Sequence, residues 1–159
     1  KVIALVRNPL SVLNSWKNAP KEFRADLGWS FESEWKCANL KNQRKPEEYF
    51  GFKRWKETTL LFRRLSSEYP DKVQLVFYSD LLRNTESVVR NIFNFVDLDF
   101  SSQTQQFLTQ SMQKGVTDTY SVFKSKSETD NNYINQIPDN IIREVTDECD
   151  ARGLSEFLL

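Results

Sequence analysis

The residues best suited to chemistry in this chain are an arginine and a serine near its start, Arg7 and Ser15. Arg7 follows Val2–Val6, an apolar, β-branched run that is typical of a strand buried on both faces. Asn8 and Pro9 then favour the start of a helix that would carry Ser15. A guanidinium fork and a hydroxyl group near a helix start can bind a phosphate. The spacing therefore predicts a phosphate site beyond the carboxyl end of this strand, where open α/β sheets bind ligands.

The segment RNPLSVLNSW resembles the strand, Arg, Asp or Asn, Pro and later Ser signature of sulfotransferases. In that family the arginine and the serine hold the 3'-phosphate of the sulfate donor, 3'-phosphoadenosine 5'-phosphosulfate. The resemblance therefore assigns donor binding to Arg7 and Ser15. Segment 77–100 resembles the family's strand that ends in Tyr-x-Asp-Leu and the helix after it, with Tyr78 and Asp80 as packing and turn residues. Two such segments in the right order are more specific than either alone.

A third part of the resemblance lies near the C-terminus. Many sulfotransferases place a flexible basic loop there, which folds over the 3'-phosphate of the donor. Lys124, Ser125 and Lys126 are similar to this loop in position and charge, so the resemblance implies that they bind the donor. The glycines and the Arg-Lys-Gly core of the cytosolic enzymes are absent from the segment, and a solvated Lys-Ser loop is the alternative.

Composition restricts the classes of function that fit the chain. Its 159 residues are 39% hydrophobic and 13% aromatic, which indicates a folded globule, and 1–159 is expected to be a single domain. Basic and acidic residues are equal at 22 each, so no overall charge favours nucleic acid or an acidic membrane, and no stretch is apolar enough to span a bilayer. The chain has no histidine, which excludes a Ser-His-Asp triad from this stretch.

The two cysteines, Cys37 and Cys149, have no metal-ligand spacing and lie far apart in the sequence. Two buried thiols are favoured over a single disulfide, because free cysteine is commonly buried. Together with the lack of an Asn-x-Ser/Thr acceptor, this favours a reducing, cytoplasmic location. An anchor upstream of Lys1 would instead place the protein in a lumen.

The remaining pattern predicts an α/β fold with a parallel sheet of the P-loop type, flanked by helices. Pro46 opens a predicted helix that runs to Glu68, and Val73–Tyr78 is the second strand, so strand, helix and strand form a parallel unit. Pro138 begins the last helix. Segment 20–45 is a long connection whose aromatic residues either line a substrate pocket or cap the core, and the resemblance makes it the candidate for selecting the acceptor.

The resemblance places part of the enzyme outside the chain. Only two strands are clear, which is too few for the usual sheet of this fold. In sulfotransferases a Lys-containing loop that holds the 5'-phosphosulfate, and a catalytic His or Glu, precede the arginine signature. Both would lie before Lys1, so the catalytic residue is unknown. We therefore expect the chain to be the C-terminal part of a sulfotransferase domain, with the N-terminal strands and the donor loop missing.

The expected function is transfer of a sulfuryl group from 3'-phosphoadenosine 5'-phosphosulfate to an acceptor hydroxyl group, without a metal. The acceptor is a small molecule or a saccharide. A carbohydrate or glycolipid is favoured over a phenol, because the C-terminal loop differs from that of the phenol enzymes. A non-catalytic nucleotide-binding module and a P-loop kinase-like phosphotransferase are the alternatives, and the upstream sequence would discriminate between them.

Overall fold

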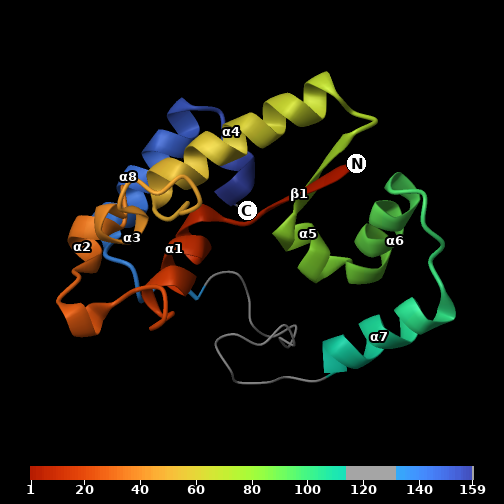
Figure 1. Ribbon diagram of the computed structural model, residues 1–159, viewed down its shortest axis with the longest axis horizontal. Coiled ribbons are helices and arrows are strands. Elements are labelled where there is room, and N and C mark those ends of the chain that lie inside the picture. The colour runs from red at the N-terminus through yellow and green to blue at the C-terminus, as the bar shows by residue number, and fades with distance from the viewer. Residues whose placement is uncertain (114–131, 159) are drawn as a thin grey trace. The chain divides into compact units, whose positions relative to one another are not determined.

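The structure is a computed structural model, and it describes residues 1–113 and 132–158 (Figure 1). These residues form two compact units, and each unit contains two separate segments of the chain. The first unit comprises Lys1–Arg7 and 62–113, and the second comprises Asn8–Leu61 and 132–158. Arg7 therefore belongs to the first unit, whereas Ser15 belongs to the second.

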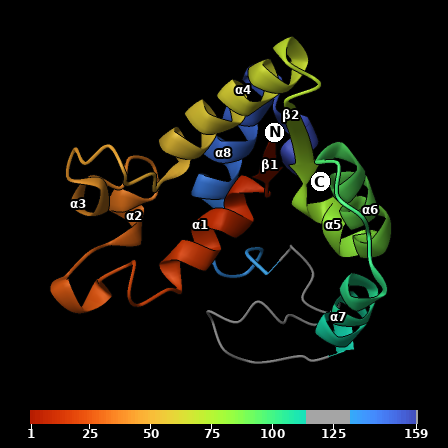
Figure 2. The same cartoon turned by 45° about the vertical axis from the view of Figure 1, so that its right-hand side comes forward.

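The first unit contains a parallel pair of strands, β1 (Val2–Val6) and β2 (Val73–Phe77), both labelled in Figure 2. The two strands pair in register from their first residue to their last, so both end at the same edge. Arg7 follows β1 at this edge, and Tyr78, which was expected to end the second strand, instead starts a helix after β2. The helices of this unit are α5 (Tyr78–Arg83), α6 (Thr85–Phe95) and α7 (Ser102–Gln113).

The strand β1 is buried on one face, so the prediction of burial on both faces is wrong. Ala4 and Val6 are buried, whereas Leu5, which points to the opposite face, is 48% exposed. Val2, at the start of the strand, is 55% exposed. Among the described residues the sheet has only these two strands, and this leaves part of β1 uncovered. The mixed α/β architecture is confirmed, and a sheet of the P-loop type stays a prediction.

The second unit is organised around α1 (Pro9–Lys17), whose N-cap is Asn8. The side-chain oxygen of Asn8 accepts hydrogen bonds from the backbone amides of Leu10 at 2.9 Å and Ser11 at 3.4 Å. Its side-chain nitrogen donates to the carbonyl oxygen of Leu158 at 2.8 Å. One side chain thus satisfies the helix start and fixes the C-terminal segment. The inward-facing residues of α1 are Leu10, Leu13 and Trp16, as predicted.

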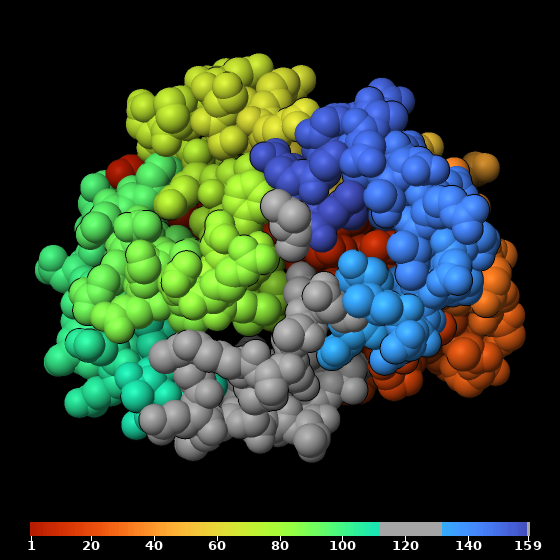
Figure 3. All heavy atoms as spheres, turned by 180° about the vertical axis from the view of Figure 1, so that it is seen from behind, coloured from red at the N-terminus to blue at the C-terminus, as the bar shows by residue number. Residues whose placement is uncertain are grey.

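The helix α8 (Asp139–Ala151) packs against α1 and supplies much of the core of the second unit. It begins directly after Pro138, as predicted. Its charged side also joins other parts of the unit, because Glu144 and Glu148 form ion pairs with Lys36 and Lys56. Seen from behind, 132–158 form one continuous face of this unit (Figure 3). The buried residues from α8 onward are Ile141, Val145, Cys149, Leu154 and, in η2 (Ser155–Leu158), Phe157.

The long helix α4 spans Phe52–Glu68, so the predicted start at Pro46 is wrong. Gly51 has a φ of 87°, a left-handed conformation that breaks any helix begun at Pro46. The backbone amide of Phe52 then donates to the carbonyl oxygen of Trp35 at 2.9 Å. The first amides of a helix lack partners within the helix. The start of α4 is therefore fixed by a contact with a segment distant in the sequence.

The aromatic residues of 20–45 lie mainly in the core, which favours the core-capping alternative over a substrate pocket. Phe31 and Trp35 are buried, and Trp29 is half-buried. The ring of Trp35 stacks on that of Phe52, with the ring centroids 6.0 Å apart. The short elements of this segment are η1 (Ala25–Leu27), α2 (Phe31–Glu34) and α3 (Asn39–Asn42).

Candidate functional site

Arg7 lies at the edge where both parallel strands end, and its guanidinium group is stacked on an aromatic ring. The guanidinium carbon lies 5.0 Å from the centroid of the Tyr78 ring. The two residues meet because Val6 pairs with Phe77, and each strand is followed by one of them. Stacking restricts the rotamers of an arginine, and a guanidinium group with one face on a ring can still donate hydrogen bonds from its N–H edge. The edge of the sheet thus carries an oriented cation that can bind an oxyanion.

Tyr78, which the sequence analysis assigned to packing, packs against the candidate site residue Arg7. The signal that could have identified this contact is the strand pairing, because residues that follow paired parallel strands lie side by side. Arg7 and Tyr78 both occupy such a position. Asp80, the other residue of that motif, lies within the first turn of α5.

Ser15 lies on the solvent side of α1, where its hydroxyl group is accessible. The other serine of this helix, Ser11, is 3% exposed. Asn14 is also buried and donates from its side chain to the carbonyl oxygen of Asn132 at 3.4 Å. The helix therefore presents Ser15, and not Ser11, to a ligand in solution. Because Ser15 and Arg7 belong to different compact units, their action on one phosphate stays a prediction.

The three other predicted donor-binding residues are Lys124, Ser125 and Lys126. All three lie outside the residues that the structure describes, and their role stays a prediction. The described part of the chain contains no cluster of three or more His, Cys, Asp or Glu residues that could hold a metal ion. No helix within 1–113 or 132–158 has the length and apolar character to cross a bilayer.

Both cysteines are free thiols, in agreement with the favoured alternative, but they differ in burial. Cys149 is buried in the second unit, and burial raises the pKa of its thiol from 9.0 to about 11, with a further contribution from Asp150 and Glu148. Cys37 is half-buried and lies three residues after the end of α2. Only the thiolate reacts rapidly with alkylating reagents. The two thiols should therefore differ strongly in reactivity.

In the native protein, iodoacetamide at pH 8 is expected to modify Cys37 and to leave Cys149 intact until the chain unfolds. Peptide mass spectrometry after a timed reaction checks this result. Since the thiol of Cys149 ionises at a higher pH in the folded state than in the unfolded state, its contribution to stability is complete below about pH 9 and is lost as the pH rises towards 11. Equal rates for the two thiols in the native protein would contradict the burial of Cys149.

Comparison with known proteins identifies the family of the chain. A family model described as a sulfotransferase domain matches residues 1–152, which is nearly the whole chain. No curated protein and no solved structure matches the chain at a significant level. The matched range includes the strand edge with Arg7 and Tyr78, the helix with Ser15, and the segment 124–126. On this match, the chain belongs to the sulfotransferase domain family.

Proposed function

We propose that this chain binds the nucleotide donor in an enzyme that transfers a sulfuryl group from 3'-phosphoadenosine 5'-phosphosulfate to a hydroxyl group of a carbohydrate or glycolipid. The main support is the position of Arg7, at the carboxyl edge of a parallel strand pair and stacked on Tyr78, within a chain of this family. This edge is where α/β sheets bind ligands, and the oriented fork suits a phosphate. The carbohydrate acceptor rests on the difference between the segment 124–126 and the loop of the phenol enzymes.

Transfer of a sulfuryl group depends on positioning and on stabilising charge more than on covalent help from the protein. The fork of Arg7 would bind two oxygens of the 3'-phosphate, and the hydroxyl group of Ser15 would donate one more hydrogen bond. Lys124, Ser125 and Lys126 would add positive charge and a further hydroxyl donor. When bound, the donor supplies the activated sulfuryl group. These residues hold its adenosine end, so that the sulfuryl group has one orientation towards the acceptor.

The test compares the binding of 3'-phosphoadenosine 5'-phosphate with that of 5'-AMP by calorimetry, on the full-length protein. A real 3'-phosphate site should bind the bisphosphate about 100-fold more tightly, since charge-assisted hydrogen bonds to a phosphate each contribute roughly 1.5–3 kcal/mol. Transfer of labelled sulfate to saccharide and phenol acceptors then identifies the acceptor class. Equal affinity for the two nucleotides would refute the proposal, and tight binding without transfer to any acceptor would favour the non-catalytic module.

Replacing Tyr78 by leucine is expected to weaken binding of the bisphosphate two- to fivefold, because an exposed cation–π contact is worth about 0.5–1 kcal/mol. The affinity for 5'-AMP should not change, since the loss acts through Arg7. The matched control is Tyr78→Phe, which keeps the ring and should keep the affinity. Titration calorimetry of both nucleotides measures these effects. If Tyr78→Leu weakens both nucleotides equally, the tyrosine does not act by positioning the arginine.

A further inference from the structure

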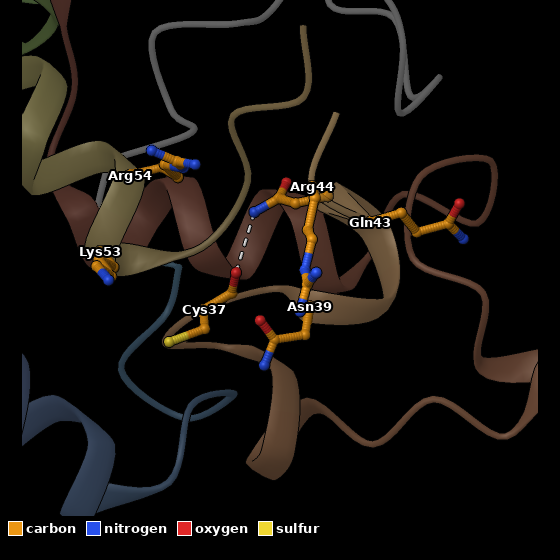
Figure 4. Close-up of a pocket in the computed structure, with 7 residues that line it drawn as sticks. Cys37, Asn39, Gln43, Arg44, Lys53 and Arg54 are labelled. Carbon is orange, nitrogen blue, oxygen red and sulfur yellow. Dashed lines mark hydrogen bonds between the residues drawn. The ribbon is translucent and has the colours of Figure 1, made fainter. Parts of the chain in front are cut away.

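The second unit contains a cavity of about 620 Å³ between the α3 loop and the start of α4 (Figure 4). This volume lies in the range of small-molecule sites, roughly 300–1,000 Å³. Three of its lining side chains are cationic, and none of the described residues that line it is acidic. All of them belong to the second unit. The lining consists of Cys37, Asn39, Asn42, Gln43, Arg44, Lys53 and Arg54.

The walls of this cavity are held in place by one buried side chain, Asn42, which is 7% exposed. Its side-chain nitrogen donates to the carbonyl oxygens of Cys37 and Phe50, both at 3.0 Å. Its side-chain oxygen accepts from the backbone amide of Phe50, also at 3.0 Å. The backbone amide of Lys53 donates to the carbonyl oxygen of Lys36 at 2.8 Å. The loop and the helix start are thus joined by a satisfied polar network, which preorganises the cavity.

The backbone at one wall adopts an unusual conformation. Gln43 and Arg44 are consecutive residues with φ values of 44° and 60°, in the left-handed region that residues other than glycine seldom enter. In Figure 4, Arg44 extends towards Asn39, whereas Gln43 points away from the other labelled side chains. Lys53 and Arg54 come from the first turn of α4. The conformation of this loop therefore places a second source of cationic charge across from the helix.

Within the described residues, only one of the three cationic side chains at the cavity forms an ion pair. Arg54 pairs with Glu57 at 3.0 Å and stacks on Tyr49, with its guanidinium carbon 5.1 Å from the ring centroid. Neither Arg44 nor Lys53 has an ion-pair partner among the residues that the structure describes. Uncompensated cations around a preformed concave surface favour an anionic ligand.

We propose that this cavity binds the carboxylate or sulfate group of an acidic saccharide. The cavity is much larger than a single oxyanion, so it has room for a ligand that carries further groups beside its charge. The exposed amide of Asn39 offers both a donor and an acceptor for sugar hydroxyl groups, while Arg44 and Lys53 neutralise the charge. The choice of a saccharide rests on the proposed function, which takes a carbohydrate acceptor.

The half-buried thiol of Cys37 lines the cavity and reports on its occupancy, while the buried Cys149 is an internal reference. On the full-length protein, the rate of alkylation of Cys37 is measured with a tetrasaccharide of alternating glucuronate and N-acetylglucosamine. The neutral tetrasaccharide of N-acetylglucosamine, inorganic phosphate and 3'-phosphoadenosine 5'-phosphate form the other arms. The acidic tetrasaccharide at saturation should slow the reaction about fivefold or more, since a bound ligand excludes the reagent from most of the cavity. Equal protection by the neutral sugar, by phosphate or by the nucleotide would overturn the proposal.

The double substitution Arg44→Gln and Lys53→Gln should weaken the protection by raising the apparent Kd at least tenfold, because each cation contributes a charge-assisted contact. The matched control is Lys45→Gln, which removes an exposed cation of the same loop that does not line the cavity. An unchanged Kd in the double variant, or an equal loss in the control, would refute the assignment. No arm depends on sulfuryl transfer or on Arg7, so a failure of the proposed function is distinguishable from a failure here.

Discussion

Replacing Arg7 by alanine is expected to weaken the binding of 3'-phosphoadenosine 5'-phosphate about 100-fold, because a bidentate, charge-assisted contact to the 3'-phosphate is lost. The affinity for 5'-AMP should not change, since this nucleotide has no 3'-phosphate. Calorimetric titration of both nucleotides into the same variant measures the difference. The preference for the bisphosphate should therefore disappear, while the fold and the adenosine contacts remain.

Two controls separate the arginine fork from general electrostatics. Arg7→Lys keeps the charge but has no planar fork, so it should recover only part of the affinity. Arg83→Ala removes an exposed arginine of α5 in the same unit and should leave both affinities unchanged. An equal loss of affinity for 5'-AMP in Arg7→Ala would mean that the arginine binds another part of the nucleotide, or that the unit is damaged.

Local features of the fold could be predicted from the sequence, because neighbouring residues determine them. The strand Val2–Val6 and the cap at Asn8 followed by Pro9 are found where the residue types place them. Pro138 and the apolar stripe after it likewise predict the last helix. Each of these elements depends on residues within one or two turns.

Features that depend on distant contacts could not be predicted in the same way. The start of α4 depends on the carbonyl oxygen of Trp35, which no pattern near Pro46 reveals. The exposure of Leu5 depends on what covers the sheet, and an apolar run alone does not give this. The cavity at Arg44 and Lys53 depends on the side chain of Asn42, which joins two separate segments. Residue type and spacing carry little information on such contacts.

The same difference between local and distant contacts applies to the residues of the candidate site. The position of Arg7 at a strand end could be predicted because the strand before it is a local feature, and its contact with Tyr78 could have been found from the pairing of the two strands. Ser15 lies on a predicted helix and is exposed there, but its distance from Arg7 depends on how the two units meet, which is a tertiary property. The resemblance for Lys124–Lys126 rests on charge and position alone.

Replacing Gly51 by alanine is expected to lower the free energy of unfolding by about 3 kcal/mol. Two penalties add, because alanine disfavours the left-handed backbone conformation and its Cβ clashes with neighbouring atoms. Gly51 has a φ of 87°, and an added Cβ would lie 3.0 Å from the carbonyl oxygen of Lys36 and 3.1 Å from the backbone nitrogen of Ala38. These neighbours are backbone atoms held by hydrogen bonds: the carbonyl oxygen of Lys36 accepts from the amide of Lys53, and the amide of Ala38 donates to the carbonyl oxygen of Glu34. They cannot move aside as a flexible side chain would. Urea denaturation measures the change in free energy.

The matched control is Gly28→Ala. Gly28 also has a left-handed φ, of 79°, but no atom lies within 4 Å of an added Cβ. This substitution should cost about 1 kcal/mol, since only the backbone conformation is penalised. The difference in the free energy of unfolding between the two variants therefore isolates the contact of Gly51 with residues 36–38. Within this segment, Cys37 lines the cavity that also contains Arg44 and Lys53. Gly51→Ala should additionally speed the alkylation of Cys37, because the wall must move to admit the methyl group. Equal destabilisation by the two substitutions would mean that the wall adapts without loss.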